Sequence, residues 1–167
     1  YSSKLIFEII AIMLIAFFSF SIAPKTLQND TFYTVSIGNL IQQNGIDMKD
    51  HYSWHNDLPY TYPHWLYDVI MSVIYNKCGW QGIYVSVCVL SILLGVLIYE
   101  INKKLNKNQI ISLIISLLSM YLLKSYIAAR AQLATFIIFI CVIYFLEKFI
   151  ENPKKLICVM NLLIKVN

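Results

Sequence analysis

Charged residues are scarce in this chain of 167 residues: Asp, Glu, Lys and Arg make up 13% of the sequence, whereas 59% of it is hydrophobic. A soluble domain is usually about 25% charged and about 45–50% apolar. The chain is therefore too apolar to cover itself in water, and the same composition excludes a disordered chain. The 13 Lys and Arg against nine Asp and Glu form no basic stripe, which excludes nucleic-acid binding. A membrane protein is the class that remains.

Metal-binding cysteine motifs are absent as well. The cysteines show no C-x-x-C spacing and mostly lie in apolar runs: Cys78, Cys88, Cys141 and Cys158. We interpret them as small apolar residues, rather than as a disulfide framework or a metal site.

Apolar stretches suited to membrane helices recur along the chain. A bilayer core about 30 Å thick requires roughly 20 mostly apolar residues in a helix. The stretches that qualify are residues 5–23, 82–99, 110–123, 132–146 and, cut off by the end of the chain, 156–166. The third is short, but it extends through Tyr126 if the Lys124 ammonium reaches the membrane surface. We predict an all-α polytopic membrane protein with about four or five membrane helices in this chain.

The two ends of the chain indicate a fragment. The sequence begins at Tyr1 rather than Met, and it ends at Asn167 inside an apolar stretch, so we expect a longer polytopic protein. The first stretch also resembles a signal peptide, because Lys4 precedes the apolar run and Ser21-Ile22-Ala23 imitates a cleavage site. The several later spans favour an uncleaved first membrane helix over residues 1–23.

The positions of Lys and Arg predict how the helices are oriented in the cell membrane. If the N-terminus is cytoplasmic, residues 24–81 and the turn at 124–130 are extracytoplasmic, and further membrane helices follow over 82–167. This orientation places the following residues on the cytoplasmic side: Lys4, Lys103, Lys104, Lys107, Lys148, Lys154 and Lys155. The basic residues that oppose it are Lys25, Lys49, Lys77, Lys124 and Arg130.

Segment 24–81 concentrates the polar chemistry of the chain. It contains all three histidines, all three tryptophans and five of the nine acidic residues. We predict two amphipathic helices in it, one from Asp30 to Asn44-Gly45 and one from Pro63 to Cys78-Gly79. Their apolar stripes are Tyr33, Ile37, Leu40 and Ile41 in the first helix, and Leu66, Val69, Ile70, Val73 and Ile74 in the second. Both are too short and too polar on one side to span, so we predict that they lie in the membrane interface, apolar face down.

Asp30 lies just after the first membrane helix, at the start of the first amphipathic helix. One interpretation is an N-cap, formed by Asp30 or Thr31, which stabilises a helix by about 0.5–2 kcal/mol and needs no function. The other is a carboxylate held at the membrane surface, where it serves as a general base or a metal ligand for a lipid-attached substrate.

A second group of acidic residues and histidines lies further along the same segment: Asp47, Asp50, His51, His55, Asp57 and His64. His51 and His55 have the spacing of a zinc-binding helix, but the residues around them are typical of a turn. One alternative is a solvated loop. The other is a set of contacts for a hard divalent cation or for an acceptor, made by Asp50, His51, His55 and Asp57.

Arg130 and Lys124 flank a predicted outside turn between two apolar runs. Charged groups at this depth are costly and are usually paired or functional. Two cations at the outer interface suit the phosphate of a lipid carrier. The alternative is that both side chains extend to the lipid headgroups.

Three short motifs follow one another along the chain: Asp30-Thr31-Phe32-Tyr33, Pro63-His64-Trp65-Leu66 and Arg130-Ala131-Gln132. Their order resembles the N-terminal part of the GT-C glycosyltransferases, multi-spanning proteins that include protein O-mannosyltransferases and aminoarabinose transferases. In that pattern an acidic motif opens the first outer loop and a proline-aromatic segment follows. The chain is also similar to a bacterial set of GT-C-like membrane proteins, in which an Arg-Pro-Gln-like motif heads a later span. The chain departs from these patterns in three places: the acidic pair is reduced to Asp30, the lysine of a Lys-Pro-Pro-like segment is absent, and Ala131 replaces a proline.

The resemblance implies an inverting transfer of a sugar from a polyprenyl-phosphate donor to an acceptor at the outer membrane face. Asp30 then acts as the base or positions the acceptor, while Arg130, Lys124 and His64 hold the donor phosphate. The implied partners are membrane lipid and the polyprenyl-phosphate sugar.

The alternative function is that of a non-enzymatic membrane protein, such as a transporter, a polysaccharide-export component or an interaction subunit. Transporters usually carry ionisable groups in mid-membrane. The apolar stretches here are almost free of them, which weighs against transport.

Overall fold

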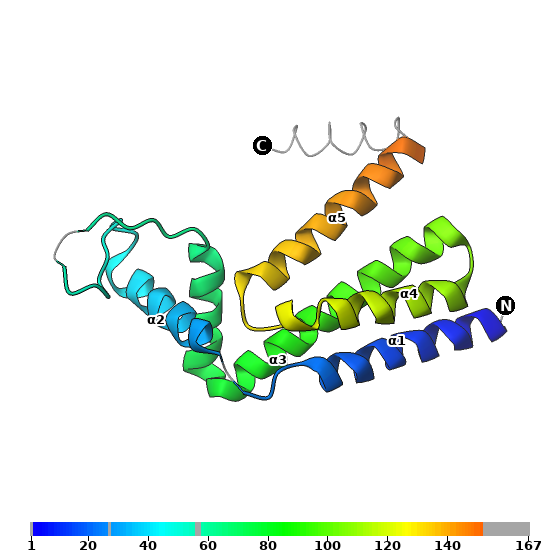
Figure 1. Ribbon diagram of the computed structural model, residues 1–167, viewed down its shortest axis with the longest axis horizontal. Coiled ribbons are helices and arrows are strands. Elements are labelled where there is room, and N and C mark those ends of the chain that lie inside the picture. The colour runs from blue at the N-terminus through cyan, green and yellow to red at the C-terminus, as the bar shows by residue number, and fades with distance from the viewer. Residues whose placement is uncertain (1, 27, 56–57, 152–167) are drawn as a thin grey trace.

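The structure is a computed structural model that describes residues 2–26, 28–55 and 58–151. Within these ranges the chain forms helices and one isolated bridge between Lys49 and Pro59, but no strand. The helices are α1 (Ser2–Ile22), α2 (Asn29–Asn44), α3 (Trp65–Asn106), α4 (Gln109–Leu122), the 3₁₀ turn η1 (Lys124–Tyr126) and α5 (Ala131–Glu151). The predicted all-α fold is confirmed (Figure 1). The predicted span at 156–166 lies outside the described residues.

Helices long and apolar enough to cross a membrane are present at α1, α3 and α5. Large apolar side chains cover the outside of these helices, and Phe17 on α1 and Ile150 on α5 are 76% and 73% exposed. Such a surface is stable against hydrocarbon and costly against water, at about 25 cal/mol per Å² of apolar area. These apolar helices are those of a membrane protein.

The shortest apolar helix, α4, does not extend as the sequence predicts. It ends at Leu122, and residues Lys124–Tyr126 form the 3₁₀ turn η1 instead of a continuation of the α-helix. The next three residues explain the break, because the side chains of Ile127, Ala128 and Ala129 are buried. Their burial draws the chain inward and away from the axis of α4.

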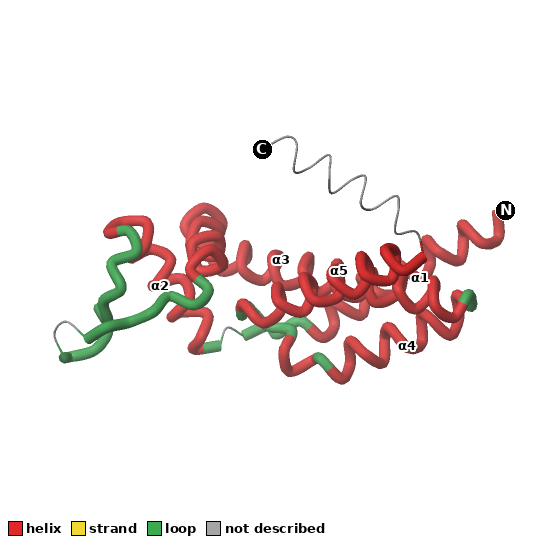
Figure 2. Tube along the Cα trace, turned by 90° about the horizontal axis from the view of Figure 1, so that it is seen from above, coloured by secondary structure: helices red, strands yellow, loops and turns green. Residues whose placement is uncertain are grey.

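A helical bundle is formed by α1, the second half of α3, α4 and α5 (Figure 2). Three of its helices pack closely at Gly95 of α3, where an added Cβ would lie 2.5 Å from Met120 Sδ of α4 and 2.6 Å from Ile15 Cγ2 of α1. The missing side chain allows α1 and α4 to approach α3 on two sides. α5 contacts α3 but leaves most of its own surface exposed.

α3 is bent within its length at Gly79, whose backbone adopts φ 60° and ψ −154°. A straight helix of 42 residues would be about 63 Å long, roughly twice the thickness of the hydrocarbon core, so only part of α3 fits in a membrane. The sequence predicts an end at Cys78-Gly79 and a new helix from Gly82. The bend confirms the break, but the helix resumes directly after it. We assign the half after Gly79 to the membrane.

The half of α3 before Gly79 packs against α2, and together with segment 45–64 these two helices form what we call the polar module. Gly38 of α2 lies against the backbone carbonyl of Asp68, where no Cβ would fit. Ile37 and Ile41, two members of the predicted stripe of α2, are buried with Tyr62. Gly45 ends α2 as predicted, and its backbone N–H donates to the carbonyl of Ile41 at 2.9 Å.

Only part of the predicted stripe of the second amphipathic helix packs on α2, where Val69 contacts the cluster of Ile37, Ile41 and Tyr62. Asp68 and Ser72 are buried, whereas Leu66 and Ile70 are exposed. The reason is the notch at Gly38, which accepts the backbone and small polar groups of α3 in place of its bulky apolar side chains. Leu66 and Ile70 therefore remain an outward apolar surface.

Candidate functional site

Asp30 and Arg130, which are far apart in the sequence, form an ion pair in the structure. Arg130 Nη2 lies 2.8 Å from Asp30 Oδ2. Asp30 is in the first turn of α2, whose cap is Gln28 without a side-chain cap hydrogen bond, so the interpretation of Asp30 as an N-cap is wrong. Its carboxylate turns instead toward the residue that precedes α5. This pair joins the polar module to the helical bundle.

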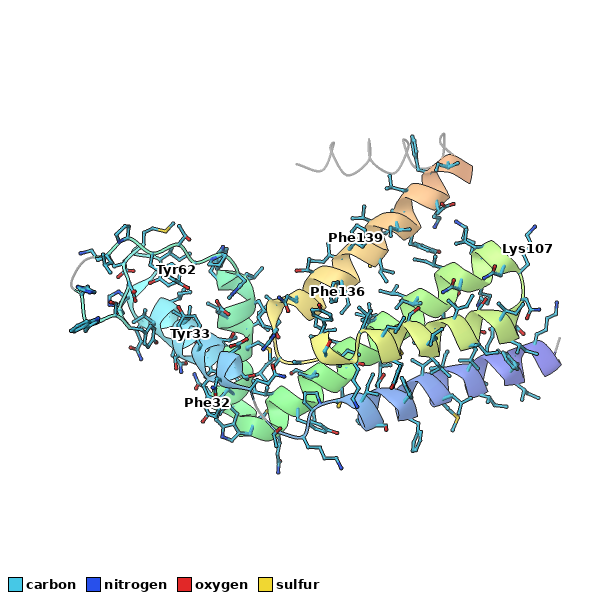
Figure 3. The ribbon with its side chains drawn as sticks, in the orientation of Figure 1. Phe32, Tyr33, Tyr62, Lys107, Phe136 and Phe139 are labelled. Atoms are coloured by element: carbon cyan, nitrogen blue, oxygen red, sulfur yellow. The ribbon has the colours of Figure 1, made fainter. Side chains whose placement is uncertain are left out.

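A pocket of about 250 Å³ surrounds the ion pair. Besides Asp30 and Arg130 it is lined by Tyr33, Thr34, His64, Ala131 and Gln132. Three residues that the sequence selects from separate motifs, Asp30, His64 and Arg130, are thereby brought to one place. Tyr33 is held there by its hydroxyl, which donates to the hydroxyl of Tyr60 at 2.8 Å, and Figure 3 shows it on α2 in the polar module.

The wall formed by Arg130 and the start of α5 is suited to an anion. The first backbone N–H groups of a helix have no partner within it and lie at the positive end of the helix dipole. Ala131 and Gln132, the first two residues of α5, line the pocket. Arg130 adds its guanidinium, whose Nε is buried and has no hydrogen-bond partner in the described part of the chain. Phosphate binds readily to this combination of groups.

His64 is paired with a buried acid, Asp68, one helical turn further along the chain. Its Nδ1 lies 2.8 Å from Asp68 Oδ2, and Asp68 is 1% exposed. Burial raises the pKa of the Asp68 carboxyl above the usual range of aspartate, and the hydrogen bond from His64 partly opposes that shift. Asp68 Oδ1 is buried without a hydrogen-bond partner among the described residues. Asp68 is not among the site residues that the sequence predicts, although its spacing from His64 in a predicted helix places the two side chains on one face.

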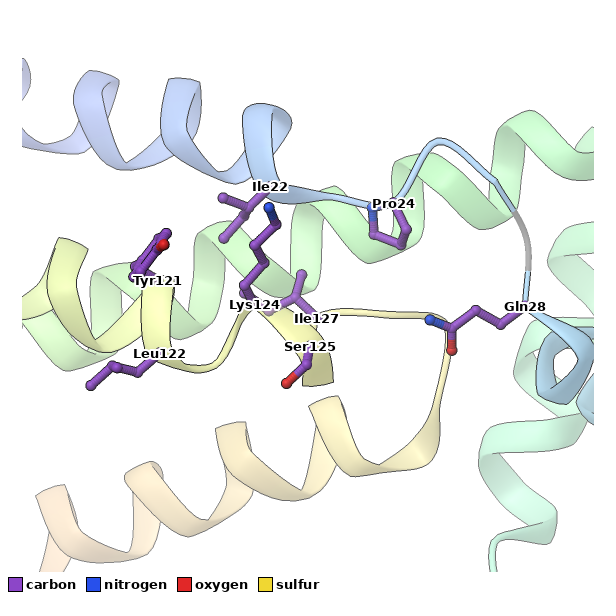
Figure 4. Close-up of a pocket in the computed structure, with 8 residues that line it drawn as sticks. All are labelled: Ile22, Pro24, Gln28, Tyr121, Leu122, Lys124, Ser125 and Ile127. Carbon is purple, nitrogen blue, oxygen red and sulfur yellow. The ribbon is translucent and has the colours of Figure 1, made fainter.

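Lys124 lies in a different pocket from Arg130. That pocket has a volume of about 540 Å³ and is shown in Figure 4. It is lined by Ile22, Pro24, Gln28, Tyr121, Leu122, Lys124, Ser125 and Ile127. The structure thus brings Arg130 and His64 together and leaves Lys124 apart from them, in an open groove between α1, α4 and η1.

The loop that follows α2 holds the remaining predicted residues. His51 Nε2 lies 2.5 Å from Asp47 Oδ2, and Asp50 accepts the backbone N–H groups of Tyr52 and Ser53. His55 donates its backbone N–H to Ser53 Oγ at 3.2 Å. None of these residues lines the pocket of Asp30, and Asp57 lies outside the described residues. The described ranges contain no group of three His, Cys, Asp or Glu side chains that could hold a metal ion.

Tyr62 fastens this loop to the polar module. Its hydroxyl donates to Asp47 Oδ1 at 3.1 Å and to the carbonyl of Lys49 at 2.9 Å. Burial, together with the neighbouring Asp47, raises the pKa of Tyr62 to about 12, so the hydroxyl stays a donor at neutral pH. The hydrogen bond from His51 lowers the pKa of Asp47. Each contact is explained within the loop, whose Asx turns are typical of a structural role.

The cysteines of the described residues are free, at positions 78, 88 and 141. Cys88 is buried, as its interpretation as a small apolar residue predicts, whereas Cys78 at the bend of α3 is exposed. Cys158 lies outside the described residues.

No protein-family model, curated protein or solved structure matches this chain.

Proposed function

We propose that this protein is a membrane glycosyltransferase that transfers a sugar from a polyprenyl-phosphate donor to an acceptor at the membrane surface. The observation that carries the proposal is the pocket at the junction of the polar module and the helical bundle, where Asp30 faces Arg130 and the start of α5. It combines an anion-binding wall with a carboxylate, at one end of apolar helices.

Arg130 holds the donor phosphate in this proposal. Its guanidinium offers several N–H donors in one plane, which match two phosphate oxygens. The N–H groups at the start of α5 add further donors. As the bond from the sugar to the phosphate breaks, negative charge grows on the phosphate oxygen, and donors fixed in advance stabilise that charge most.

Asp30 contacts the acceptor, either as the base or as the residue that orients it. Its carboxylate is more than half exposed and pairs with Arg130. A donor phosphate competes with Asp30 for the guanidinium. Binding of the donor therefore frees an oxygen of Asp30 for a hydroxyl group of the acceptor.

The apolar helices beside the pocket are suited to the lipid part of the donor. The exposed side chains of α1 and α5 are suited to hydrocarbon, and a prenyl chain remains in the membrane while its phosphate reaches the pocket. With the N-terminus in the cytoplasm, segment 24–81 and the pocket lie on the extracytoplasmic side. Lys124, in its separate groove, is then available for lipid headgroups or for the prenyl-phosphate carrier before it reaches Arg130.

The test uses membranes that contain the protein and a panel of radiolabelled polyprenyl-phosphate hexoses and pentoses. Release of polyprenyl phosphate from one of these donors is expected for the wild type. Asp30→Asn abolishes the release without reducing expression, because the amide can neither accept a proton nor form the ion pair. The matched control is Asp47→Asn, the same substitution in the loop of the polar module, which retains the wild-type rate. Wild-type release by Asp30→Asn, or no release from any donor, contradicts the proposal.

A further inference from the structure

The pocket contains a second pair of ionisable groups that the proposed function leaves unused. His64 lines the pocket beside Asp30 and Arg130, and its Nδ1 is held by Asp68 from behind. The His64 side chain is 40% exposed and that of Asp68 is 1% exposed. The imidazole therefore stands between a buried carboxylate and the open space of the pocket.

The cost of burying Asp68 indicates that the pair does more than stabilise the fold. A buried carboxylate loses much of its solvation, and an uncharged residue of similar size is often as stable at such a position. His64 and Thr34 lower the pKa of Asp68 by hydrogen bonding, but burial outweighs them and the pKa stays raised, so the burial is only partly compensated. His64 precedes α3 as its cap residue but makes no side-chain cap hydrogen bond. Neither residue is explained by capping or by apolar packing.

The hydrogen bond to Asp68 fixes the tautomer of His64. A carboxylate accepts a hydrogen bond and thereby holds the imidazole proton on Nδ1. Nε2 is then the nitrogen with a free lone pair. Asp30 pairs with the guanidinium of Arg130 at 2.8 Å until the donor phosphate competes for it. His64 differs from Asp30 in that a buried second side chain, Asp68, holds it in one tautomer and leaves Nε2 to accept a proton.

We infer that His64 is the catalytic base that takes the proton from the acceptor hydroxyl, and that Asp68 is its positioning residue. This inference rests on the proposed function and decides between the two roles left to Asp30, which then orients the acceptor. The same acid–histidine arrangement activates hydroxyl nucleophiles on unrelated folds.

The step is balanced with the groups in the pocket. The acceptor oxygen forms a bond to the anomeric carbon of the sugar and gives its proton to His64 Nε2. The bond between that carbon and the phosphate oxygen breaks, and its electron pair leaves with the phosphate, which Arg130 stabilises. The imidazolium that results is held by the Asp68 carboxylate until it returns the proton to water.

The charged and titratable groups around His64 come from each element that packs on it. Asp68 and Tyr67 lie on α3, Asp30 and Tyr33 on α2, and Arg130 precedes α5.

The first experiment measures steady-state transfer from the active donor of the panel against pH. His64→Gln and Asp68→Asn each lower kcat by about 10²–10⁴-fold, the usual contribution of a general base, and change KM little. In the wild type the rate falls toward acid pH as the imidazole becomes protonated, and His64→Gln loses this acid limb.

Imidazole added to the buffer partly restores the transfer activity of His64→Gly. Binding of citronellyl phosphate, a prenyl phosphate without a sugar, is unchanged in His64→Gln and lost in Arg130→Ala.

A spectroscopic readout separates this inference from the proposed function. In the ¹⁵N NMR spectrum of the histidine-labelled protein, the signals that disappear in His64→Gln identify His64 among the three histidines. We expect them to report an Nδ1–H tautomer in the wild type and a mixture of tautomers in Asp68→Asn. If no donor reacts but the tautomer is as expected, the proposed function fails and the pair stands as an oriented base. An Nε2–H tautomer, or an unchanged acid limb in His64→Gln, overturns the inference.

Discussion

Two charge clusters lie at opposite ends of the helical bundle, and they are built differently. At one end, beyond the end of α1, Asp30 and Arg130 face a pocket. At the other, Lys103 Nζ lies 2.8 Å from Glu100 Oε1 and 3.1 Å from Glu8 Oε1. We call this second group the distal cluster. Both tie helices together across long distances in the sequence.

The two clusters differ in whether their polar atoms all have hydrogen-bond partners. In the distal cluster one ammonium meets two carboxylates, and Gln109 adds a hydrogen bond to Glu8 at 3.3 Å. Its residues line neither of the two pockets described above. The cluster at Arg130 instead retains a buried guanidinium Nε without a partner among the described residues. Polar groups that are costly to leave unpaired, beside a cavity, indicate a ligand, whereas charges that satisfy one another indicate a structural tie.

The largest expected difference between the two clusters follows from removing the cation of each one. Arg130→Ala is expected to lower transfer by about 10²–10³-fold, the usual loss when a donor to a developing negative charge is removed. Lys103→Ala retains the transfer rate and lowers the free energy of unfolding by about 1 kcal/mol or less, because its ion pairs are partly solvated. The transfer rate and the free energy of unfolding of both variants are measured on purified protein in detergent. Equal losses of transfer would show that the two clusters do not differ in kind.

A smaller effect is expected from filling the two glycine contacts. Gly38→Leu and Gly95→Leu each lower the free energy of unfolding by about 1–3 kcal/mol, the usual cost of overpacking, as measured by thermal melts. Gly38→Leu also separates α2 from α3, which moves Asp30 away from His64 and abolishes transfer. Gly95→Leu acts within the helical bundle and spares the pocket, so transfer persists below its melting temperature. A transfer loss in Gly95→Leu alone would reverse this expectation.

The positions of the helices could be predicted from the sequence because apolar runs and the spacing of glycine determine them locally. Gly45 and Gly79 were both expected to end or break a helix, and both do so. The contact of Asp68 and Ser72 of α3 with α2 was not predicted, because it depends on the space left at Gly38 in another helix. Such a fit is a property of two surfaces, and a hydrophobic pattern describes only one.

The candidate site was also predictable only in part, because single residues can be selected from the sequence but the contacts between helices cannot. Asp30, His64 and Arg130 were each selected by type and by position in a motif, and the structure places all three in one pocket. Asp68 was missed because a lone aspartate in an amphipathic helix is expected to face water. Its burial follows from the contact with α2. Lys124 was grouped with Arg130 on the basis of sequence proximity, but the turn η1 directs it into another groove.

A still smaller effect is expected in a pH titration, which tests how the Asp47–His51 contact stabilises the loop of the polar module. The hydrogen bond from His51 lowers the pKa of Asp47, so the folded loop is stabilised above the ordinary aspartate value of 3.8. This stabilisation is lost as the pH falls through the lower pKa of the folded state. Trp54 fluorescence in the wild type is therefore expected to change at more acid pH than any carboxylate with an ordinary pKa allows. Asp47→Asn removes that transition, and a transition that persists in the variant assigns it to another group.

Thiol labelling tests the orientation of the two ends without perturbing the fold. Cys78 is exposed and Cys88 is buried, so an impermeant maleimide added outside intact cells is expected to label Cys78 and to spare Cys88 and Cys141. Cys78→Ser then serves as the unlabelled control. Protection of Cys78 in intact cells, with labelling of a cysteine placed at Asn106, the last residue of α3, would reverse the orientation and put the pocket on the cytoplasmic side.

The separation of Asp30 and Arg130 along the chain has a consequence for how the protein is made. Asp30 leaves the ribosome well before Arg130, with α3 and α4 synthesised in between. Throughout that interval the carboxylate has no arginine to meet, and the pocket does not exist. The ion pair therefore forms as a late event of membrane insertion, and a chain released before α5 carries every acidic group of the site without the cation that completes it.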